Sequence, residues 1–328
     1  MLFPQGRRAD MKVLVTGGNG FLGSAVLREL QAQRIDSVGT VRKHHGENPA
    51  EEFVQVGDIN AQTDWNVALE GVEAVVHCAA RVHVMNEDAD NALEAFREVN
   101  VEGTLNLARL AANAGVKRLL FISSIKVNGE GTRLGRLFRH DDAPAPEDAY
   151  GQSKAEAEAG LLAVARETGL DVVIIRPPLV YGPGVKANFA SLMRLASKNL
   201  PLPLGAIRNK RSMVALENLV SLIVTCINHP NAANQTFLVS DDQDISTTEL
   251  LTLMTRAAGK TPRLLPIPMS WLSVGAAMLG KKSIADRLCG SLQVDIGHTK
   301  ESLGWTPPLS VENGIKRCFL SSDEFTQI

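Results

Sequence analysis

A glycine-rich turn directly after the first apolar segment constrains this chain more than any other feature. Residues 12–15 form a short apolar strand, and the turn that follows reads TGGNGFLG over residues 16–23. Glycines at such a junction allow a tight turn, and the start of the next helix offers N–H groups and a partial positive charge to a pyrophosphate. The order of strand, glycines and helix predicts dinucleotide contacts from Gly17, Asn19, Gly20, Phe21, Leu22 and Gly23.

Strand-like and helix-like segments alternate through the first half of the chain, which predicts parallel strands joined by crossover helices. The expected strands are residues 12–16, 36–41, 52–56, 73–78, 117–123 and 171–176. The expected helices are residues 21–33, 63–69, 90–114 and 149–168. The predicted fold class is therefore α/β, with a Rossmann-type doubly wound parallel sheet at residues 11–178.

The rhythm of the sequence changes after residue 178, where prolines punctuate short helical segments. Residues 179–328 are expected to form mainly a smaller C-terminal substrate-binding α/β lobe, intertwined with the first. This half contains a strand-like stretch at 236–239 and a late helix within 292–305, followed by an extended finish. Residues 1–10 lack the apolar core of a secretory signal and are expected to be a poorly ordered leader.

Composition excludes several classes of function. The formal net charge is −2 and no long run of Lys or Arg occurs, so nucleic acid is not expected as a partner. The apolar stretches at 219–227 and 271–279 fall far short of the roughly 20 residues that cross a bilayer, which predicts a cytoplasmic protein without a membrane partner. The four cysteines are widely spaced without a CxxC pair, so no metal site is expected.

Tyr150 and Lys154 stand four residues apart at the start of a predicted helix, which places both side chains on one face. A phenol with an ordinary pKa of about 10 is a poor base at neutral pH, but a neighbouring ammonium and an oxidised nicotinamide both favour the phenolate. We therefore expect Tyr150 to have a lowered pKa and to exchange a proton with a substrate hydroxyl or carbonyl. Ser123 and Ser124 end a predicted strand, where catalytic groups gather in doubly wound sheets.

Together these motifs resemble those of the extended short-chain dehydrogenase/reductase family, also known as the NAD-dependent epimerase/dehydratase family. The resemblance rests on the spacing of the glycine turn, the Tyr150 and Lys154 pair, and the segments Gly57-Asp58-Ile59, His77-Cys78-Ala79-Ala80 and Asn100-Val101-x-Gly103-Thr104. It implies that Ser124, Tyr150 and Lys154 form the catalytic triad of an oxidoreductase or epimerase. It also implies cofactor contacts from Asp58, Ile59, Cys78, Ala79, Ala80, Asn100, Ser123, Tyr150, Lys154 and Pro177.

The end of the second predicted strand bears on the choice of cofactor. An acidic residue there accepts the ribose hydroxyls of NAD, whereas an arginine accommodates the 2′-phosphate of NADP. Here the strand leads into Arg42-Lys43, with no Asp or Glu. Arg42 and Lys43 are expected to pair with the phosphate by charge-assisted hydrogen bonds, which favours NADP(H). Two solvated surface cations would give the same sequence, so NAD(H) stays open.

The second half resembles the nucleotide-sugar members of this family. Residues 211–220 match their RSxVxxxxLV segment, in which the arginine binds the substrate diphosphate. A guanidinium suits this task because it makes bidentate contacts to phosphate oxygens. Arg211 is therefore the expected diphosphate ligand, with Asn188 and Arg287 as further candidates. The implied small-molecule partner is a UDP-sugar.

Residues 123–130 narrow the reaction within that set. They read SSIKVNGE and resemble the UDP-4-keto-6-deoxy-N-acetylglucosamine 4-reductases, which make UDP-N-acetylquinovosamine for the O-antigen of lipopolysaccharide. The resemblance implies substrate contacts from Ser124 and Lys126. True 4-epimerases usually carry a small hydroxyl residue at the position of Lys126 and a tyrosine at that of Asn128, and this sequence departs from both. The expected function is NADP(H)-dependent 4-keto reduction of a UDP-sugar.

Three alternatives stay open because fold alone does not separate them. The chain could be a nucleotide-sugar 4-epimerase with bound NAD, another carbonyl reductase or hydroxysteroid-type dehydrogenase, or a non-catalytic dinucleotide-sensing protein. Loss of the tyrosine or the lysine would mark the last of these, and both are present.

Relatives in the family also imply a homodimer through the helices at 90–114 and 149–168. The small residues offered for that face are Ala155, Ala157, Ala159 and Leu161. Packing within one chain would explain the same residues.

Overall fold

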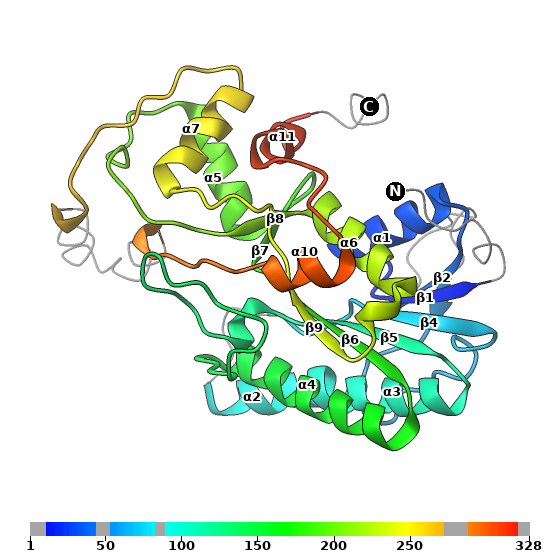
Figure 1. The fold of residues 1–328 in the computed structure, drawn as a ribbon. Helices are drawn as coiled ribbons and strands as arrows, with labels where there is room; N and C mark the ends of the chain where they lie inside the picture. Colours follow the sequence, from blue (N-terminus) through cyan, green and yellow to red (C-terminus); the bar gives the residue numbers. More distant parts are fainter. Residues whose placement is uncertain (1–10, 44–52, 83–88, 272–287, 321–328) are drawn as a thin grey trace.

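The computed structural model describes residues 11–43, 53–82, 89–271 and 288–320 (Figure 1). Within these residues, seven strands form one sheet in the order β3-β2-β1-β4-β5-β6-β9, and all neighbours run parallel. The strands are β1 (Lys12–Thr16), β2 (Asp36–Val41), β3 (Phe53–Gln55), β4 (Val72–His77), β5 (Arg118–Ile122), β6 (Asp171–Arg176) and β9 (Gln235–Leu238). The winding reverses between β1 and β4, as in a Rossmann-type fold, so the predicted fold class is confirmed.

Two layers of helices cover the sheet (Figure 1). One face carries α1 (Phe21–Ala32) and α6 (Leu216–Asn228), and the other carries α2 (Ala89–Arg97), α3 (Thr104–Asn113) and α4 (Ala149–Thr168). Alternate residues of β1 enter the two layers: Val13 and Val15 share a core with Leu30 of α1, whereas Leu14 shares one with Leu107 of α3. All five side chains are fully buried. The strand that leads into the glycine turn is therefore held from both sides.

A second lobe follows the carboxyl ends of β6 and β9. Its strands β7 (Leu179–Tyr181) and β8 (Met213–Ala215) form a parallel pair. Among the described residues, its helices are α5 (Ala187–Lys198), α7 (Thr247–Ala257) and α11 (Val311–Arg317), whereas α10 (Gly297–Leu303) packs beside β9 of the main sheet. The Tyr181 ring stacks on Phe189 with 5.2 Å between ring centroids, and its hydroxyl donates to Asp241 at 2.6 Å. These contacts lie at the centre of a small hydrophobic core that belongs to the second lobe.

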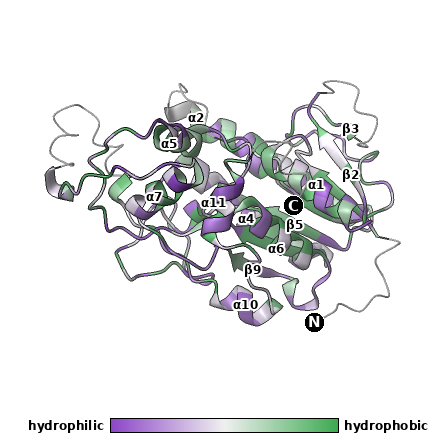
Figure 2. Cartoon of the chain, turned by 90° about the horizontal axis from the view of Figure 1, so that it is seen from above, coloured by the Kyte–Doolittle hydropathy of each residue, from purple (hydrophilic) through white to green (hydrophobic). Residues whose placement is uncertain are grey.

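The two lobes exchange chain segments. Beyond residue 178 the chain returns to the first lobe twice, as α6 and as β9. Strand β9 pairs with β6 from Val173 to Arg176. The strand-like stretch predicted at 236–239 is thus the edge of the main sheet rather than part of the second lobe. Seen from above, β5 and β9 show apolar residues, whereas α7 and α11 carry hydrophilic ones (Figure 2).

Two local expectations are wrong. Residues 63–69 form turns instead of a helix, because the side chains of Asn60 and Asp64 accept the N–H groups of Gln62 and Asn66 at 2.8 and 2.9 Å. Such side-chain bonds offer the backbone an alternative to the helical ladder. The extended finish predicted after residue 305 contains α11, which Ser310 caps.

The predicted helix at 90–114 is present and contains a π-helical turn, η1 (Glu98–Gly103), between α2 and α3. A Cβ on Gly103 would lie 2.5 Å from Cγ2 of Ile59, so the turn packs tightly against the segment that follows β3. Turns of this kind are often found at functional sites. Here the turn brings Asn100 into the interior.

Packing within one chain uses part of the proposed dimer face. Ala157 and Leu161 are fully buried in the core beneath α4, whereas Ala155 is partly exposed and Ala159 is exposed. The homodimer stays a prediction. In the described ranges, no helix has both the length and the apolar character needed to cross a membrane. The predicted leader at 1–10 and the candidate ligand Arg287 lie outside the described residues.

Candidate active site

The glycine turn closes tightly on itself. Gly17 has a φ of 67°, which glycine adopts without strain. Its carbonyl oxygen accepts the N–H of Gly20 at 2.9 Å, and a Cβ on Gly23 would lie only 2.2 Å from that same oxygen. The turn therefore requires glycine at both ends.

The first turn of α1 is suited to an anion. Gly20 is the N-cap residue, so the helix begins without a side-chain capping bond. Asn19, Gly20 and Phe21 are exposed at this point, while Leu22 packs against the core. Amide groups at a helix start and the helix dipole favour a negative group such as a pyrophosphate. These residues fit a dinucleotide.

A buried histidine joins this turn to the end of β4. Thr16 accepts the N–H of Ala79 at 3.1 Å, and its hydroxyl lies 2.7 Å from Nδ1 of His77. Nε2 of His77 lies 3.0 Å from the hydroxyl of Thr104. Burial, and then the charge of Lys154, lower the pKa of His77 to about 3, so the ring is neutral. The predicted contacts Cys78, Ala79 and Ala80 follow this strand end, each partly exposed.

Arg42 and Asp58 meet at the outer end of the predicted cofactor site. Their side chains are 75% and 78% exposed, and Nη1 of the arginine lies 3.7 Å from Oδ1 of the aspartate. Lys43 is exposed beside them. Arg42, expected to bind the 2′-phosphate, thus lies beside Asp58, another expected cofactor contact, whereas Ile59 packs against Gly103.

Lys154 is enclosed beneath Tyr150, with 1% of its surface exposed. Its ammonium donates to the carbonyl oxygen of Ile122 at 2.9 Å and lies 4.4 Å from the centre of the Phe121 ring. The same nitrogen is 5.9 Å from the centre of the Tyr150 ring. Tyr150 packs edge-on against Phe96, with 5.9 Å between ring centroids. The start of α4 therefore presents both residues at the carboxyl end of β5, as their spacing predicts.

The protein groups around Tyr150 do not favour its phenolate. Burial, and then the carboxylate of Asp148, raise the pKa of Tyr150 to about 12. The lowering of the Tyr150 pKa expected from Lys154 together with an oxidised nicotinamide is not reached by the described protein groups, because the ammonium is turned toward a backbone carbonyl and an aromatic ring. Burial also lowers the pKa of Lys154 to about 8. At neutral pH Tyr150 is protonated and suited to donate a proton.

The two serines after β5 have different surroundings. Ser124 is partly exposed and caps the short 3-10 helix η2 (Ile125–Val127) by accepting the N–H of Lys126 at 3.2 Å. In this bond the hydroxyl is the acceptor, so its proton can serve a substrate oxygen. Ser123 is buried, and its hydroxyl donates to Glu158. That hydroxyl is therefore used inside the protein.

A buried ion pair lies beneath the serines. Glu158 of α4 and Arg176 at the end of β6 are 4% and 5% exposed, and Oε2 and Nη2 are 2.6 Å apart. Nη1 of Arg176 donates to Asn128 at 3.0 Å, and Asn128 donates to the carbonyl oxygen of Arg139 at 3.0 Å. Sequence reasoning missed this network, although Glu158 follows Lys154 by one helical turn.

Asn100 connects the loop after β4 to the start of α4. Its side chain accepts the N–H of Arg81 at 2.8 Å and donates to the Arg81 carbonyl at 3.1 Å and to Ser153 at 3.0 Å. Ser153 in turn donates to the carbonyl oxygen of Tyr150 at 2.8 Å. Pro177 has a similar backbone role, because its carbonyl accepts the N–H of Ile125 at 3.0 Å. Their predicted contacts with a cofactor stay predictions.

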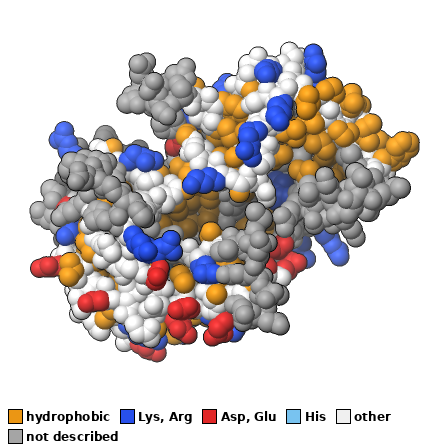
Figure 3. Space-filling view, turned by 180° about the vertical axis from the view of Figure 1, so that it is seen from behind, with side chains coloured by type: hydrophobic (Ala, Val, Ile, Leu, Met, Phe, Trp, Pro, Cys, Tyr) orange, Lys and Arg blue, Asp and Glu red, His pale blue; other side chains and the backbone are white. Residues whose placement is uncertain are grey.

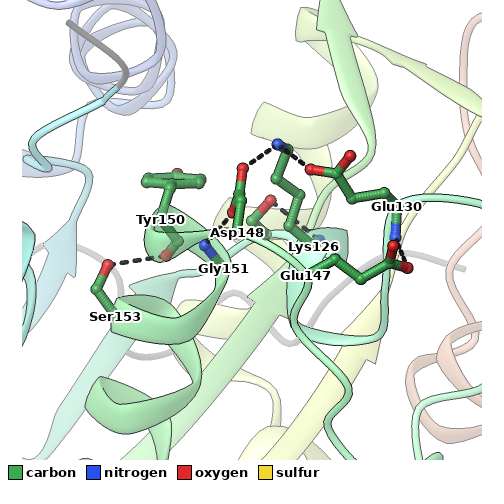
Figure 4. A network of polar contacts seen from close by, with 8 residues as sticks. Lys126, Glu130, Glu147, Asp148, Tyr150, Gly151 and Ser153 are labelled. Atoms are coloured by element: carbon green, nitrogen blue, oxygen red, sulfur yellow. Dashed lines mark hydrogen bonds and ion pairs between the residues drawn. The ribbon is translucent and has the colours of Figure 1, made fainter. Parts of the chain in front are cut away.

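Lys126 lies between two carboxylates beside Tyr150 (Figure 4). Its ammonium donates to Oε1 of Glu130 at 2.7 Å and to Oδ2 of Asp148. Burial opposes the charge, but the hydrogen bonds to Asp148 and Glu130 raise the pKa of Lys126 above its usual value. The predicted substrate contact is therefore a paired cation at neutral pH.

The described candidates for the diphosphate both belong to the second lobe. Arg211 forms backbone bridges with Ile245 and Leu292, and its Nη1 donates to the carbonyl oxygen of Gly290 at 3.4 Å. Burial lowers the pKa of Arg211, although an arginine remains charged at any physiological pH. Asn188 is exposed near the start of α5.

A sequence model of the NAD dependent epimerase/dehydratase family matches residues 13–240. The chain belongs to this family. The match spans the glycine turn, the triad and β9, so the resemblance seen in the sequence is confirmed.

A UDP-glucose 4-epimerase of Vibrio cholerae is 51% identical to this family member over 312 residues, with 95% of each chain covered. The solved UDP-N-acetylglucosamine 4-epimerase from Bacillus cereus has a TM-score of 0.77 at 20% identity, covering 94% of this chain and 98% of that one. UDP-glucose 4-epimerase of Thermotoga maritima, solved with UDP-glucose, has a TM-score of 0.73 at 23% identity, covering 97% and 99%. Structures of this fold include complexes with NAD and with NADPH.

Replacing Tyr150 by phenylalanine should remove the proton donor while keeping the ring packing against Phe96. Turnover should fall by about 10²–10⁴-fold, the usual contribution of general acid–base catalysis. Cofactor affinity, measured by fluorescence titration, should stay within about twofold. Near-normal turnover in Tyr150→Phe would remove this residue from the chemistry.

Replacing Glu158 by glutamine should leave the buried Arg176 charge without its counter-ion. The free energy of unfolding should fall by about 3–5 kcal/mol, the usual cost of breaking a buried pair. Glu156→Gln is the matched control on the same helix, because its pair with Arg97 is partly exposed and should contribute about 1 kcal/mol or less. Urea unfolding of both variants checks this, and equal losses would contradict the assigned role of the buried pair.

Proposed function

We propose that this family member is an NADP(H)-dependent reductase of the C4 keto group of a UDP-sugar, of the UDP-4-keto-6-deoxy-N-acetylglucosamine to UDP-N-acetylquinovosamine type. One observation carries the proposal: Tyr150 is kept neutral by its surroundings and lies in a site with Ser124. A ketone reductase begins each turnover with a proton donor, whereas a 4-epimerase begins by removing a proton from the sugar hydroxyl. Tyr150 is in the protonated form that the first task requires, and its surroundings disfavour the phenolate that the second task requires.

The segment after β5 supports the same choice. By resemblance, 4-epimerases carry a small hydroxyl residue and a tyrosine where this chain has Lys126 and Asn128. Both side chains have specific partners here, since Lys126 is bonded to two carboxylates and Asn128 is part of the buried Arg176 network. The departure from the epimerase pattern is therefore built into the site.

The residues of the triad divide the chemical work. Ser124 donates a hydrogen bond to the keto oxygen and orients it, and Tyr150 donates its proton to that oxygen as negative charge develops there. The ammonium of Lys154 lies beneath the ring and stabilises the phenolate that results. The nicotinamide, when bound, supplies the hydride to C4.

The second lobe has a charge that suits a nucleoside diphosphate. Figure 3 shows Lys and Arg side chains with few Asp or Glu on the upper part of the molecule, whereas the lower part carries both signs. Residues 186–211 contain no Asp or Glu, and their cations are Lys186, Arg194, Lys198, Arg208, Lys210 and Arg211. A surface of one sign raises the local concentration of an oppositely charged substrate. We infer that the diphosphate of the UDP-sugar binds this lobe, with Arg211 as its main ligand.

A nucleotide-sugar 4-epimerase with bound NAD is the second candidate. The relative from Vibrio cholerae, 51% identical, is named UDP-glucose 4-epimerase and favours this alternative. An epimerase must keep its reduced cofactor between two half-reactions, whereas a reductase releases the oxidised cofactor after every turnover. The two candidates therefore differ in their need for added NADPH.

The test is to offer the purified protein UDP-4-keto-6-deoxy-N-acetylglucosamine with NADPH or NADH and to follow the absorbance of the reduced nicotinamide. Stoichiometric loss of that absorbance with NADPH, and formation of the 4-hydroxy sugar, are the expected results. No loss with either cofactor, together with interconversion of UDP-glucose and UDP-galactose without added NADPH, would replace the reductase with the epimerase.

Arg42→Ala should weaken NADPH binding by about 10- to 100-fold, the range expected for losing a hydrogen bond to a charged group, and should leave NADH binding nearly unchanged. Arg28→Ala is the matched control, because Arg28 is an exposed cation on α1 in the same half of the molecule. Calorimetric titration with both cofactors measures the effect. Equal weakening of NADPH and NADH would mean that the 2′-phosphate is bound elsewhere.

A further inference from the structure

Lys126, Asp148 and Glu130 form an ionic cluster beside Tyr150 (Figure 4). The ammonium of Lys126 donates to both carboxylates, and the lysine side chain is 34% exposed. Its backbone is also fixed near α4, because a Cβ on Gly151 would lie 2.8 Å from the carbonyl oxygen of Lys126. The cation is therefore held at the start of the helix that carries Tyr150.

Asp148 links this cluster to the catalytic tyrosine. Its Oδ1 accepts the N–H of Gly151 at 2.7 Å as the N-cap of α4, and its Oδ2 accepts from Lys126. Although burial opposes it, the bonds from Lys126 and Gly151 hold the pKa of Asp148 below its usual range, so the carboxylate is charged. Figure 4 places the Tyr150 ring beside it. Of the described groups, Asp148 is the one whose charge disfavours the phenolate.

We infer that Lys126 is a positioning residue of the active site, which screens the Asp148 carboxylate from Tyr150 and so keeps the tyrosine able to give up its proton. Opposite charges near one another largely cancel the field that each exerts on a third group. Without Lys126, the negative charge of Asp148 would act on the phenol without a compensating cation. The inference rests on the proposed acid–base role of Tyr150 and does not depend on which sugar is reduced.

Several other charged groups near Tyr150 have partners of their own. The titratable groups with described side chains on the elements around it include Lys154, Glu156 and Glu158 on α4, Glu94 and Arg97 on α2, Lys126 on η2, Glu130, Glu147 and Asp148 in the loop, and His77 and Cys78 at the end of β4. Arg97 is paired with Glu156, and Arg176 is paired with Glu158. Glu147 accepts the N–H of Glu130 at 3.2 Å. The pair formed by Lys126 and Asp148 ties the charge that acts on Tyr150 to a partner that a substitution can remove.

The composition of the chain allows a direct measurement. It contains two tyrosines, Tyr150 and Tyr181. Tyr181 is fully buried and donates to Asp241, and burial followed by that carboxylate raises its pKa far above the usual range. In the NADP⁺-bound protein labelled with ¹³Cζ-tyrosine, two NMR signals are therefore expected. The signal missing from Tyr150→Phe belongs to Tyr150, and the Tyr181 signal serves as the internal reference.

Lys126→Met should raise the titration midpoint of the Tyr150 signal by about one pH unit, because an unscreened negative charge now opposes the phenolate. Asp148→Asn should lower that midpoint, because asparagine keeps the capping acceptor for Gly151 and removes the charge. Lys126→Arg should keep the Tyr150 midpoint of the unaltered protein, because it keeps the positive charge. The double variant Lys126→Met, Asp148→Asn should have a midpoint close to that of the unaltered protein. Lys117→Met is the control, since it removes an exposed lysine paired with Glu73 at the opposite end of β5.

The pH profile of reduction should move in the same sense. Activity requires protonated Tyr150, so its alkaline limb should shift upward in Lys126→Met, while the rate at neutral pH should fall because a phenol with a higher pKa gives up its proton less readily. An unchanged Tyr150 midpoint in both Lys126→Met and Asp148→Asn would overturn the inference. The NMR titration needs no sugar substrate, so it separates this outcome from failure of the proposed reductase activity. Should Lys126→Met not fold, Asp148→Asn tests the same coupling from the other side.

Discussion

The buried ion pair between Glu158 and Arg176 is the interaction on which the active-site end of the sheet depends. It joins α4 to β6 where both side chains are withdrawn from solvent, and its two residues also bind Ser123 and Asn128. Moving two charges out of water is unfavourable unless each keeps several polar partners. In this protein the contacts that satisfy the pair also fix the segment that carries Ser124. The contacts that make burial of the two charges possible are therefore the same contacts that set the shape of the site.

Withdrawal from water also shapes Tyr150 and Lys154. Burial raises the pKa of Tyr150 to about 12 and lowers that of Lys154 to about 8, so both groups are pushed toward their neutral forms. The low pKa of His77, a neutral link between β1 and α3, has the same cause. A site of this kind responds strongly to each charge that is added or removed, because little solvent is present to screen it. The ionic cluster around Lys126 acts within that sensitive environment.

Local sequence was sufficient for the strands of the first half, the glycine turn and the placing of Tyr150 and Lys154, because the pattern of each lies within a few residues. Spacing could not reveal that Arg42 meets Asp58, that Arg176 meets Glu158, or that Asp148 meets Lys126, since only the folded chain brings these residues together. The protein groups alone do not lower the pKa of Tyr150, for a related reason. Helical spacing places two side chains on one face, but it does not say that the ammonium will turn to the Ile122 carbonyl. The helix expected at 63–69 was lost to turns made by polar side chains.

The position of β9 has a consequence for the chain as it leaves the ribosome. When synthesis has reached Arg176, all residues of the triad and of the buried ion pair have been made, yet β6 still lacks its neighbour on one edge. That edge stays unpaired until Leu238 has emerged, and β7, α5, β8 and α6 are made in the interval. An uncovered parallel strand edge can pair with another chain, which makes such intermediates prone to aggregation. Tyr150, Lys154 and the buried ion pair are therefore made well before β9 can complete the sheet, and the second lobe is made during the delay.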